Sequence, residues 1–504
     1  MESLLILGGN SATAGLVTTA RSMGVRTLVV DKNPRAYAKK FADASYDIDG
    51  TDVEGIERIA REEKVDGVML GAVEELMDTY QKVCEGLGMR CYATKELLDL
   101  FSDKSAFKEA CRSNGVPTTE GGLCGLDDIE KLRDRRFPLI VKPIDSSGSR
   151  GIRVCYGFEE LRPAIEGALS FSETDKVLVE RYMTGQEVVV YYAFQDGEPV
   201  LLGICDRYTN HERASRAQLP TSYIFPSRYT EGYMASEDAV VKEMFRKVGV
   251  QNGVMFLQGF ADDDGTLRFY ESGYRLNGAQ EHHIIDRLCG IDAKRMMVDF
   301  ALRGRMADFD LRDRADPLLG GRYGCKLSVL MEPGTIHEVV GLDEISGMDG
   351  VVFVNPSYDI GETVKDAGTL KQIVCRFFVV ADTIQELKER IDRIYGAYDV
   401  LAEDGSSLLM EQFDTGLLDR NYRRSRIDHG IGSGVQVISR TDRTGPPTAP
   451  RSRAPCRTPC RTGSAGTSPG KRTRGAPRRW VSSRPGAPLC GPGCPRTCPP
   501  RPSG

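Results

Sequence analysis

The sequence predicts an α/β protein of several domains that opens with a doubly wound parallel sheet. Three observations predict it. Short apolar runs alternate with helical patterns from residue 3 to about residue 86, strand patterns separated by turn signals follow between residues 137 and 271, and the composition changes at residue 440. A chain of 504 residues is too long for one hydrophobic core, so we expect two to four domains.

The first segment reads strand, turn, helix, strand. Residues 3–7 form an apolar run, a Gly8-Gly9-Asn10-Ser11 turn and a helical pattern follow, and residues 26–30 form a second buried-strand pattern. The alternation continues with a helix over 56–63, a strand over 65–70 and a helix to Gly86, which is typical of a parallel sheet. The turn lacks the G-x-G-x-x-G pattern and does not favour a dinucleotide.

Two acids, Glu74 and Glu75, follow the end of the 65–70 strand. Ligands of open α/β sheets bind at the carboxyl ends of the strands, which makes these acids candidate ligand contacts. They are equally well explained as acids favoured at a helix N-terminus by the helix dipole. Both interpretations stay open.

A hairpin is predicted over residues 137–154, with Lys142 at the end of its first strand and a Ser/Gly tip over 146–151. Small residues let the backbone approach a ligand closely, and successive N–H groups at such a tip favour anions such as phosphate. A mobile hairpin with an ordinary lysine is the alternative.

Further strands are expected downstream of the hairpin. The patterns cover residues 177–183, 188–194, 254–261 and 267–271, and a helix is expected over 103–114. An acidic D-D-D-G turn joins the last two strands, which indicates an antiparallel pair. In such a pair Gln258 and Glu271 would face the same side of the sheet, near the ligand.

Taken in order, these motifs resemble those of ATP-grasp enzymes, with a spacing similar to biotin carboxylase and the carbamoyl phosphate synthetase large chain. The motifs are Lys104, the loop V-K-P-I-D-S-S-G-S-R-G, the hinge V-L-V-E-R-Y-M, G-Q-E, Gln258 and E-S-G-Y-R. The resemblance implies a pre-ATP-grasp α/β domain over 1–100, an ATP-grasp domain of two α+β lobes over 101–310, and a C-terminal α+β portion over 311–425. A disordered tail would occupy 426–504.

The resemblance also implies roles for single residues, with ATP and Mg²⁺ or Mn²⁺ as the cofactors. The catalytic residues would be Arg275 and Lys142, and the metal ligands would be Gln258 and Glu271. Lysines would meet the phosphates, the small-residue loop would close over them, the hinge would hold adenine and Glu187 would lie near the ribose. These nucleotide-binding residues are Lys104, Lys142, Ser146, Ser147, Gly148, Ser149, Gly151, Glu180, Arg181, Tyr182, Met183 and Glu187.

One position departs from the family pattern Glu-x-Asn-x-Arg. The sequence has Gly273 where the family has an asparagine that helps to hold a second metal, and Asn277 is a candidate replacement. The departure puts the two-metal arrangement in doubt and, with it, full activity.

The implied activity is that of an ATP-dependent ligase. Such an enzyme activates a small carboxylate as an acyl phosphate, an amine or similar nucleophile attacks it, and ADP and phosphate leave. The alternatives are an enzyme that activates bicarbonate, as biotin carboxylase does, and an inactive ATP-binding regulatory module. Dimers are common among relatives, so a homodimer is expected.

A second stretch, residues 206–229, is polar and is expected to be an irregular substrate or lid loop. Its candidate anion-binding residues are Arg207, His211, Arg213 and Arg216, although a solvated surface loop explains them as well. The adjacent His282 and His283 do not indicate a metal site, because neighbouring residues on a helix point in different directions.

Charge and cysteine usage narrow the function classes. The net charge is −5, but residues 440–504 hold 14 Lys or Arg against one acid, which leaves 1–439 at about −5 − 13 = −18. An acidic body argues against nucleic-acid partners. Nine scattered cysteines between residues 84 and 375, with no apparent leader, indicate reduced thiols in a cytoplasmic protein. The apolar runs are too short for a membrane span.

The basic stretch over 440–504 contains 14 of the 25 prolines and almost no large aliphatic residues. It cannot bury a core and is expected to be disordered. Its composition suggests out-of-frame translation, and a nucleic-acid-binding tail is the functional alternative.

Overall fold

The computed structural model describes residues 1–144, 151–210 and 219–422. The chain divides into two units, residues 1–431 and 432–504, and all of the described residues belong to the first. Several sequence-predicted residues lie outside the described residues: Ser146, Ser147, Gly148, Ser149, His211, Arg213 and Arg216, together with the basic tail.

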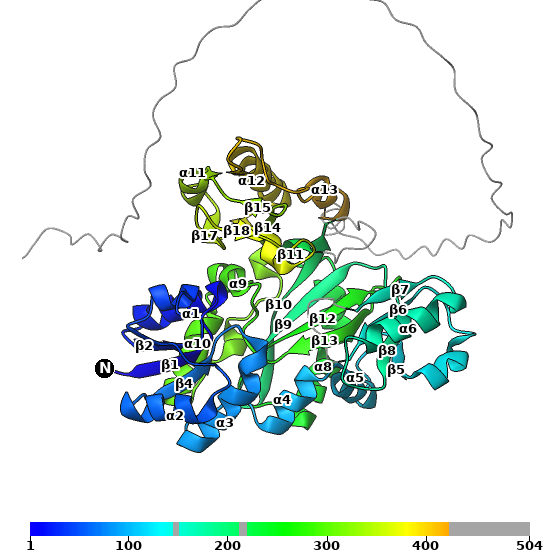
Figure 1. Ribbon diagram of the computed structural model, residues 1–504, viewed down its shortest axis with the longest axis horizontal. Helices are drawn as coiled ribbons and strands as arrows, with labels where there is room; N and C mark the ends of the chain where they lie inside the picture. The colour runs from blue at the N-terminus through cyan, green and yellow to red at the C-terminus, as the bar shows by residue number, and fades with distance from the viewer. Residues whose placement is uncertain (145–150, 211–218, 423–504) are drawn as a thin grey trace, which may run out of the picture. The chain divides into compact units, whose positions relative to one another are not determined.

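The N-terminal segment forms a four-stranded parallel sheet in the order β3-β2-β1-β4, which confirms the predicted fold class (Figure 1). Its strands are β1 (Ser3–Leu7), β2 (Arg26–Val30), β3 (Ala44–Tyr46) and β4 (Gly67–Leu70). The helix α1 (Ser11–Ser22) connects β1 to β2, α2 (Val53–Glu62) connects β3 to β4, and α3 (Met77–Leu87) follows β4. A distant helix, α10 (Ala293–Arg303), packs against α1, β1 and β4, so the sheet is covered by a segment that comes far later in the chain.

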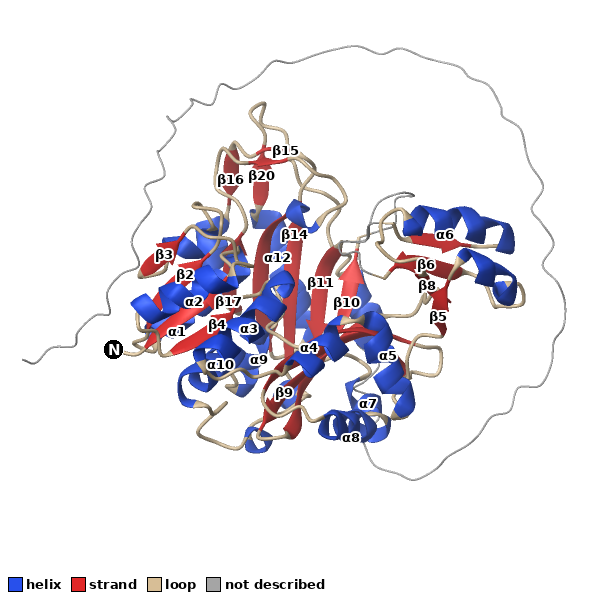
Figure 2. Cartoon of the chain, turned by 60° about the horizontal axis from the view of Figure 1, so that its bottom comes forward, coloured by secondary structure: helices blue, strands red, loops and turns tan. Residues whose placement is uncertain are grey.

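A small antiparallel sheet contains the predicted hairpin, and its order is β5-β8-β6-β7. The strands are β5 (Gly121–Cys124), β6 (Leu139–Pro143), β7 (Arg153–Cys155) and β8 (Val177–Arg181). Leu139 is paired with Cys155, which confirms the hairpin. The helix α6 (Leu161–Leu169) packs on this sheet, as Figure 2 shows, and it shares a separate hydrophobic core with the sheet.

A large sheet of eight strands is antiparallel throughout, in the order β13-β12-β9-β10-β11-β14-β19-β17. It runs across residue 310, so the C-terminal portion shares one sheet with the preceding lobe. The domain boundaries stay a prediction. The strands are β9 (Glu187–Gln195), β10 (Glu198–Thr209), β11 (Pro220–Phe225), β12 (Gly253–Ala261), β13 (Leu267–Gly273), β14 (Tyr323–Leu330), β17 (Val351–Pro356) and β19 (Ile373–Ala381).

The expectation of an irregular loop over 206–229 is wrong at residues 206–209 and 220–225. Residues 206–209 finish β10 and residues 220–225 form β11, and the two strands are paired. The polar residues of this stretch suggested a loop, but their partners lie inside the fold. Asp206 is fully buried and accepts a 2.6 Å hydrogen bond from the Tyr422 hydroxyl.

The remaining elements surround these three sheets. The helix α5 begins at Lys104 with Asp103 as its N-cap, and α12 begins after a capping box formed by Thr383 and Glu386. Within the described residues no helix is both long and apolar enough to span a membrane. These elements are α4 (Lys95–Ser102), α5 (Lys104–Ser113), α7 (Thr230–Ser236), α8 (Asp238–Val248), α9 (His282–Cys289), α11 (Leu342–Ser346), α12 (Ile384–Ala397), α13 (Gly416–Tyr422) and the short strands β15 (Gly334–Thr335), β16 (Glu338–Val340), β18 (Thr363–Val364) and β20 (Asp399–Leu401).

Candidate active site

Glu180 lies at the centre of a buried network between the small sheet and α5. Its carboxylate accepts a 3.0 Å hydrogen bond from the Lys142 ammonium and a 2.9 Å hydrogen bond from the Thr119 hydroxyl. Lys108 forms an ion pair with the same carboxylate and donates a 2.8 Å hydrogen bond to Thr119. Glu180 and Lys108 are each 1% exposed, so this charge cluster is shielded from water.

Lys108 was not predicted. It lies one helical turn after Lys104, on the same face of α5 as the buried Phe107 and Cys111, and a lysine on an apolar face was the available signal. Burial, reinforced by the neighbouring Lys142, lowers the pKa of Lys108 to about 7. Burial also lowers the pKa of Lys142 to about 8; nearby Lys104 acts in the same direction, while Glu271 opposes it.

The predicted adenine hinge lies at the end of β8. The Arg181 N–H donates to the Glu120 carbonyl at 2.8 Å and the Tyr182 N–H to the Pro138 carbonyl at 3.0 Å. The Arg181 guanidinium also pairs with Asp262 at 3.3 Å. The backbone N–H groups of Arg181 and Tyr182 are therefore already hydrogen-bonded within the protein. Met183, at the end of this stretch, is buried.

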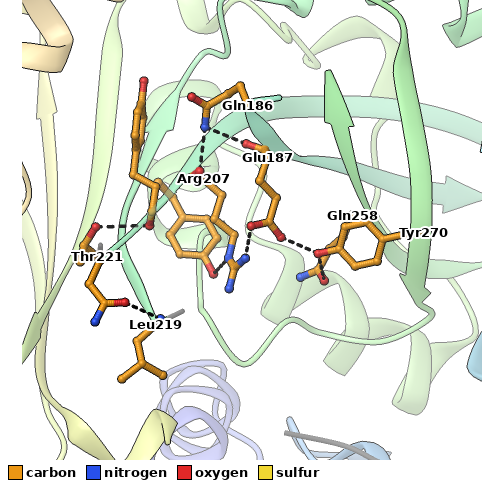
Figure 3. A network of polar contacts seen from close by, with 10 residues as sticks. Gln186, Glu187, Arg207, Leu219, Thr221, Gln258 and Tyr270 are labelled. Atoms are coloured by element: carbon orange, nitrogen blue, oxygen red, sulfur yellow. Dashed lines mark hydrogen bonds and ion pairs between the residues drawn. The ribbon is translucent and has the colours of Figure 1, made fainter. Parts of the chain in front are cut away.

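Glu187 is held on the large sheet by two partners. Arg207 from β10 forms an ion pair with it and the Tyr270 hydroxyl donates to it (Figure 3). The Tyr270 hydroxyl also donates to the Gln258 amide oxygen at 3.2 Å. The Arg207 guanidinium donates to the Tyr223 hydroxyl at 3.1 Å. Arg207, predicted as a loop residue that grips an anion, is instead a strand residue with a carboxylate partner.

The two predicted metal ligands are cross-strand neighbours. Gln258 on β12 is paired directly with Glu271 on β13, so both side chains leave the same face of the sheet, as expected. The same face carries Glu187, and the ring of Tyr270 lies 5.3 Å from the Lys142 ammonium of the small sheet. The two lobes therefore present a cation and oxygen ligands to one another.

Arg275 lies beyond β13 and is bound to the N-terminal domain. Its guanidinium forms a 2.6 Å ion pair with Glu74 and lies 5.2 Å from the ring centroid of Phe256. Glu74 thus contacts a predicted catalytic residue, at the carboxyl end of the parallel sheet. Of the two interpretations of Glu74, the pairing favours a role at the site over a helix-dipole role alone.

The departure at Gly273 has a steric explanation. Gly273 is paired with Phe256, and a Cβ atom placed on Gly273 would lie 2.2 Å and 2.4 Å from two ring carbons of Phe256. The phenylalanine ring occupies the space that an asparagine would need. The sequence showed the missing asparagine, but only the strand register shows which side chain replaces it.

Gly151, the last residue of the predicted phosphate loop, has a positive φ of 73°. A Cβ atom there would lie 2.7 Å from Pro143 and 2.9 Å from Phe171, so a glycine is needed both for conformation and for space. Lys104 begins α5 and is close enough to Lys142 to influence its pKa. The functional roles predicted for these residues stay predictions.

Comparison with known proteins finds a matching domain. Residues 135–280 match the ATP-grasp domain. The chain carries an ATP-grasp domain. The carbamoyl phosphate synthase large chain of Clostridium beijerinckii is 26% identical over 269 residues, which are 52% of this chain and 24% of that protein. The chain therefore spans about a quarter of that relative's length.

Solved structures agree on the ATP-grasp fold. The biotin carboxylase domain of Hydrogenobacter thermophilus 2-oxoglutarate carboxylase is 19% identical, with a TM-score of 0.67, over 81% of this chain and 91% of that one. The L-amino acid ligase of Bacillus licheniformis is 16% identical, with a TM-score of 0.65, over 80% and 99%. At these identities the likeness concerns the fold.

Proposed function

We propose that this ATP-grasp protein is an ATP-dependent ligase that activates a carboxylate as an acyl phosphate for attack by an amine or a similar nucleophile. One observation carries the proposal: Lys142 of the small sheet faces the row of Glu187, Gln258 and Glu271 on the large sheet. Phosphoryl transfer needs cations and oxygen-bound metal around the phosphates and little covalent chemistry from the protein.

The charged residues divide the work by position. Lys104 and Lys142 would bind the phosphates, and Glu180 holds the Lys142 ammonium in place, which reduces the cost of orienting it. Arg275 would stabilise the charge of the transferred phosphoryl group after leaving Glu74. Glu187, held by Arg207 and Tyr270, would contact the ribose.

The donor set of the sheet fits magnesium. Gln258 and Glu271 offer oxygen ligands from paired strands, and Mg²⁺ prefers one or two such protein ligands together with phosphate oxygens. Bound there, Mg²⁺ or Mn²⁺ would neutralise phosphate charge. Phe256 fills the place of a third protein ligand, so the proposal needs no asparagine at position 273.

The hinge would bind adenine chiefly through Met183. The N–H groups of Arg181 and Tyr182 serve the small sheet, and the Glu180 carboxylate serves Lys108 and Lys142. Glu180 therefore contributes to nucleotide binding by placing Lys142. The Hydrogenobacter carboxylase domain was solved in complex with MgADP, ADP and bicarbonate, which supports a nucleotide at this site of the shared fold.

We also propose small-molecule carboxylate and amine substrates, a homodimer and a cytoplasmic location. The same Hydrogenobacter domain was solved as a dimer. Nine cysteines of the described residues are free thiols, which suits a reducing compartment. Light scattering after size exclusion tests the dimer, since a monomer at micromolar concentration would contradict it.

The activity is tested by ADP release from the full chain with ATP and Mg²⁺. Pools of carboxylic acids, amines, amino acids and bicarbonate are supplied in turn, with Glu271→Ala as the matched inactive variant. We expect release that needs both a carboxylate and a nucleophile and that falls at least a hundredfold in the variant. Release with bicarbonate alone, or equal release by the variant, would refute the ligase assignment.

A further inference from the structure

A second buried polar cluster lies on the face of the large sheet that carries Glu187, outside the network of Figure 3. Its members are Lys326, Ser328, Arg376 and Asn355 of the sheet, together with Glu281. Glu187 is paired with Arg207, Arg207 with Tyr223, and Tyr223 with Lys326 of β14. Directly paired residues of antiparallel strands share a face, so one polar row crosses four strands from Glu187 to Lys326. Tyr223 lies between two cations: its ring centroid is 5.9 Å from the Arg207 guanidinium and 4.0 Å from the Lys326 ammonium.

Two further strands continue this cluster. Ser328 of β14 is paired with Arg376 of β19, and Arg376 with Asn355 of β17. Lys326 and Arg376 are therefore diagonal neighbours, a relation that places two residues about 7–8 Å apart, with their Cβ atoms somewhat closer. Glu281 is the one member of the cluster outside the sheet. It precedes α9, and α9 packs on β14, β17 and β19.

The cluster is buried, and several of its polar atoms lack hydrogen-bond partners, although Arg376 Nη1 donates to the Ser357 hydroxyl at 3.3 Å. Lys326, Ser328, Asn355 and Glu281 are 1%, 2%, 5% and 0% exposed. Among the described residues, neither Glu281 oxygen has a hydrogen-bond partner, and the same holds for Arg376 Nε, Asn355 Nδ2 and the Ser328 hydroxyl. Leaving such groups buried and unpaired is costly, so their concentration at one place indicates that a ligand completes their bonds.

The charges define that ligand. Lys326 and Arg376 repel one another in an environment of low polarity, and burial with this repulsion lowers the pKa of Lys326 to about 7. Burial raises the pKa of Glu281, although Lys326 opposes the shift. An anion between the two cations and a cationic donor at Glu281 would relieve both penalties.

We propose that Lys326, Arg376 and Glu281, with Ser328 and Asn355, bind the zwitterionic end of an α-amino acid substrate. The α-carboxylate would lie on Lys326 and Arg376, and the α-ammonium on Glu281. The inference rests on the proposed function, because the polar row leads from this cluster to the nucleotide site. It narrows the substrates of the ligase to a pair of which at least one member is an α-amino acid.

Binding to the full chain in the presence of MgADP tests the zwitterion requirement. Isothermal titration compares matched sets: L-alanine, propionate and ethylamine; L-leucine, 4-methylpentanoate and 3-methylbutylamine; and L-phenylalanine, 3-phenylpropionate and phenethylamine. We expect one amino acid to bind at least tenfold more tightly than both of its counterparts. Equal binding of a des-amino acid, or no binding by any amino acid, overturns the proposal.

Variants assign the contacts. Lys326→Met should weaken the binding of the amino acid at least tenfold, and Glu281→Gln should reduce its advantage over the des-amino counterpart. Lys371→Met changes an exposed lysine outside the cluster and serves as the control, which should bind as the unchanged chain does. If Lys326→Met does not fold, the Glu281→Gln comparison still decides. Unaltered preference in Glu281→Gln contradicts the assignment.

The same experiment separates this inference from the ligase assignment. Zwitterion-dependent binding without ADP release under any pool would keep the amino-acid site and refute the ligase. ADP release that needs a carboxylate and an amine, neither of them an amino acid, would keep the ligase and refute the amino-acid site.

Discussion

Gly273→Ala should destabilise the protein, although glycine-to-alanine changes inside regular structure usually stabilise it. The new Cβ would lie 2.2, 2.4 and 3.0 Å from three ring carbons of Phe256, against an ordinary carbon contact of about 3.5–4.0 Å. Phe256 is 4% exposed, paired within the sheet and covered by Arg275, so its ring has little freedom to move away.

The magnitude follows from two opposing effects. Overpacking of a well-filled site costs about 1–3 kcal/mol, whereas the lower chain entropy of alanine in the unfolded state returns about 0.4–1 kcal/mol. We therefore expect a net loss of about 1–2 kcal/mol in the free energy of unfolding. Urea denaturation followed by circular dichroism measures it.

The control for this experiment is Gly167→Ala in α6, where no atom lies within 4 Å of the added Cβ. It should stabilise by about 0.5–1 kcal/mol. The double variant Gly273→Ala with Phe256→Leu should recover part of the loss, since contacting sites couple by about 0.5–3 kcal/mol. A Gly273→Ala variant as stable as Gly167→Ala would refute the steric explanation of the missing asparagine.

Four other predictions concern the charged groups. Lys142 is protonated below a pKa of about 8, so the affinity for MgADP should fall as pH rises through 8, and a constant affinity from about pH 7 to 9.5 would contradict this. Through the same group, stability should rise with pH between about 8 and 10.5, where only the unfolded chain keeps the proton. Lys108→Met should cost about 1–3 kcal/mol of unfolding free energy, because Glu180 loses a buried partner, and a neutral effect in urea denaturation would remove Lys108 from the network. Glu74→Gln should tighten the binding of a non-hydrolysable ATP analogue by a few fold at most, because the half-exposed ion pair between Glu74 and Arg275 is worth about 0–1 kcal/mol. Calorimetric titration measures this affinity. Weaker binding by the variant would show that Glu74 orients Arg275 rather than restrains it.

Local patterns determined much of the fold. The apolar runs of β1 and β2 and the intervening turn and helix required a parallel sheet, and turn signals set the β6–β7 and β12–β13 hairpins. These features depend on side-chain periodicity and turn chemistry within a few residues, which a sequence displays directly. The strand pattern suggested that Gln258 and Glu271 share a face, but their direct pairing depends on a register shift between Gln258 and Gly259 that only the structure shows.

Long-range pairing decided the rest. Lys108 pairs with Glu180 across 72 positions of sequence, and Arg275 pairs with Glu74 across 201. Glu281 and Lys326 influence each other's pKa, and α9, which follows Glu281, packs on β14. Polar residues over 206–209 looked like a loop because their partners, Glu187 and Tyr422, lie elsewhere in the chain. The sequence by itself determined the strands and helices that local patterns mark, and it indicated candidate nucleotide-binding residues. Only the tertiary structure decided which charges neutralise one another and which remain for a ligand, because electrostatic energy depends on distance in space and on burial.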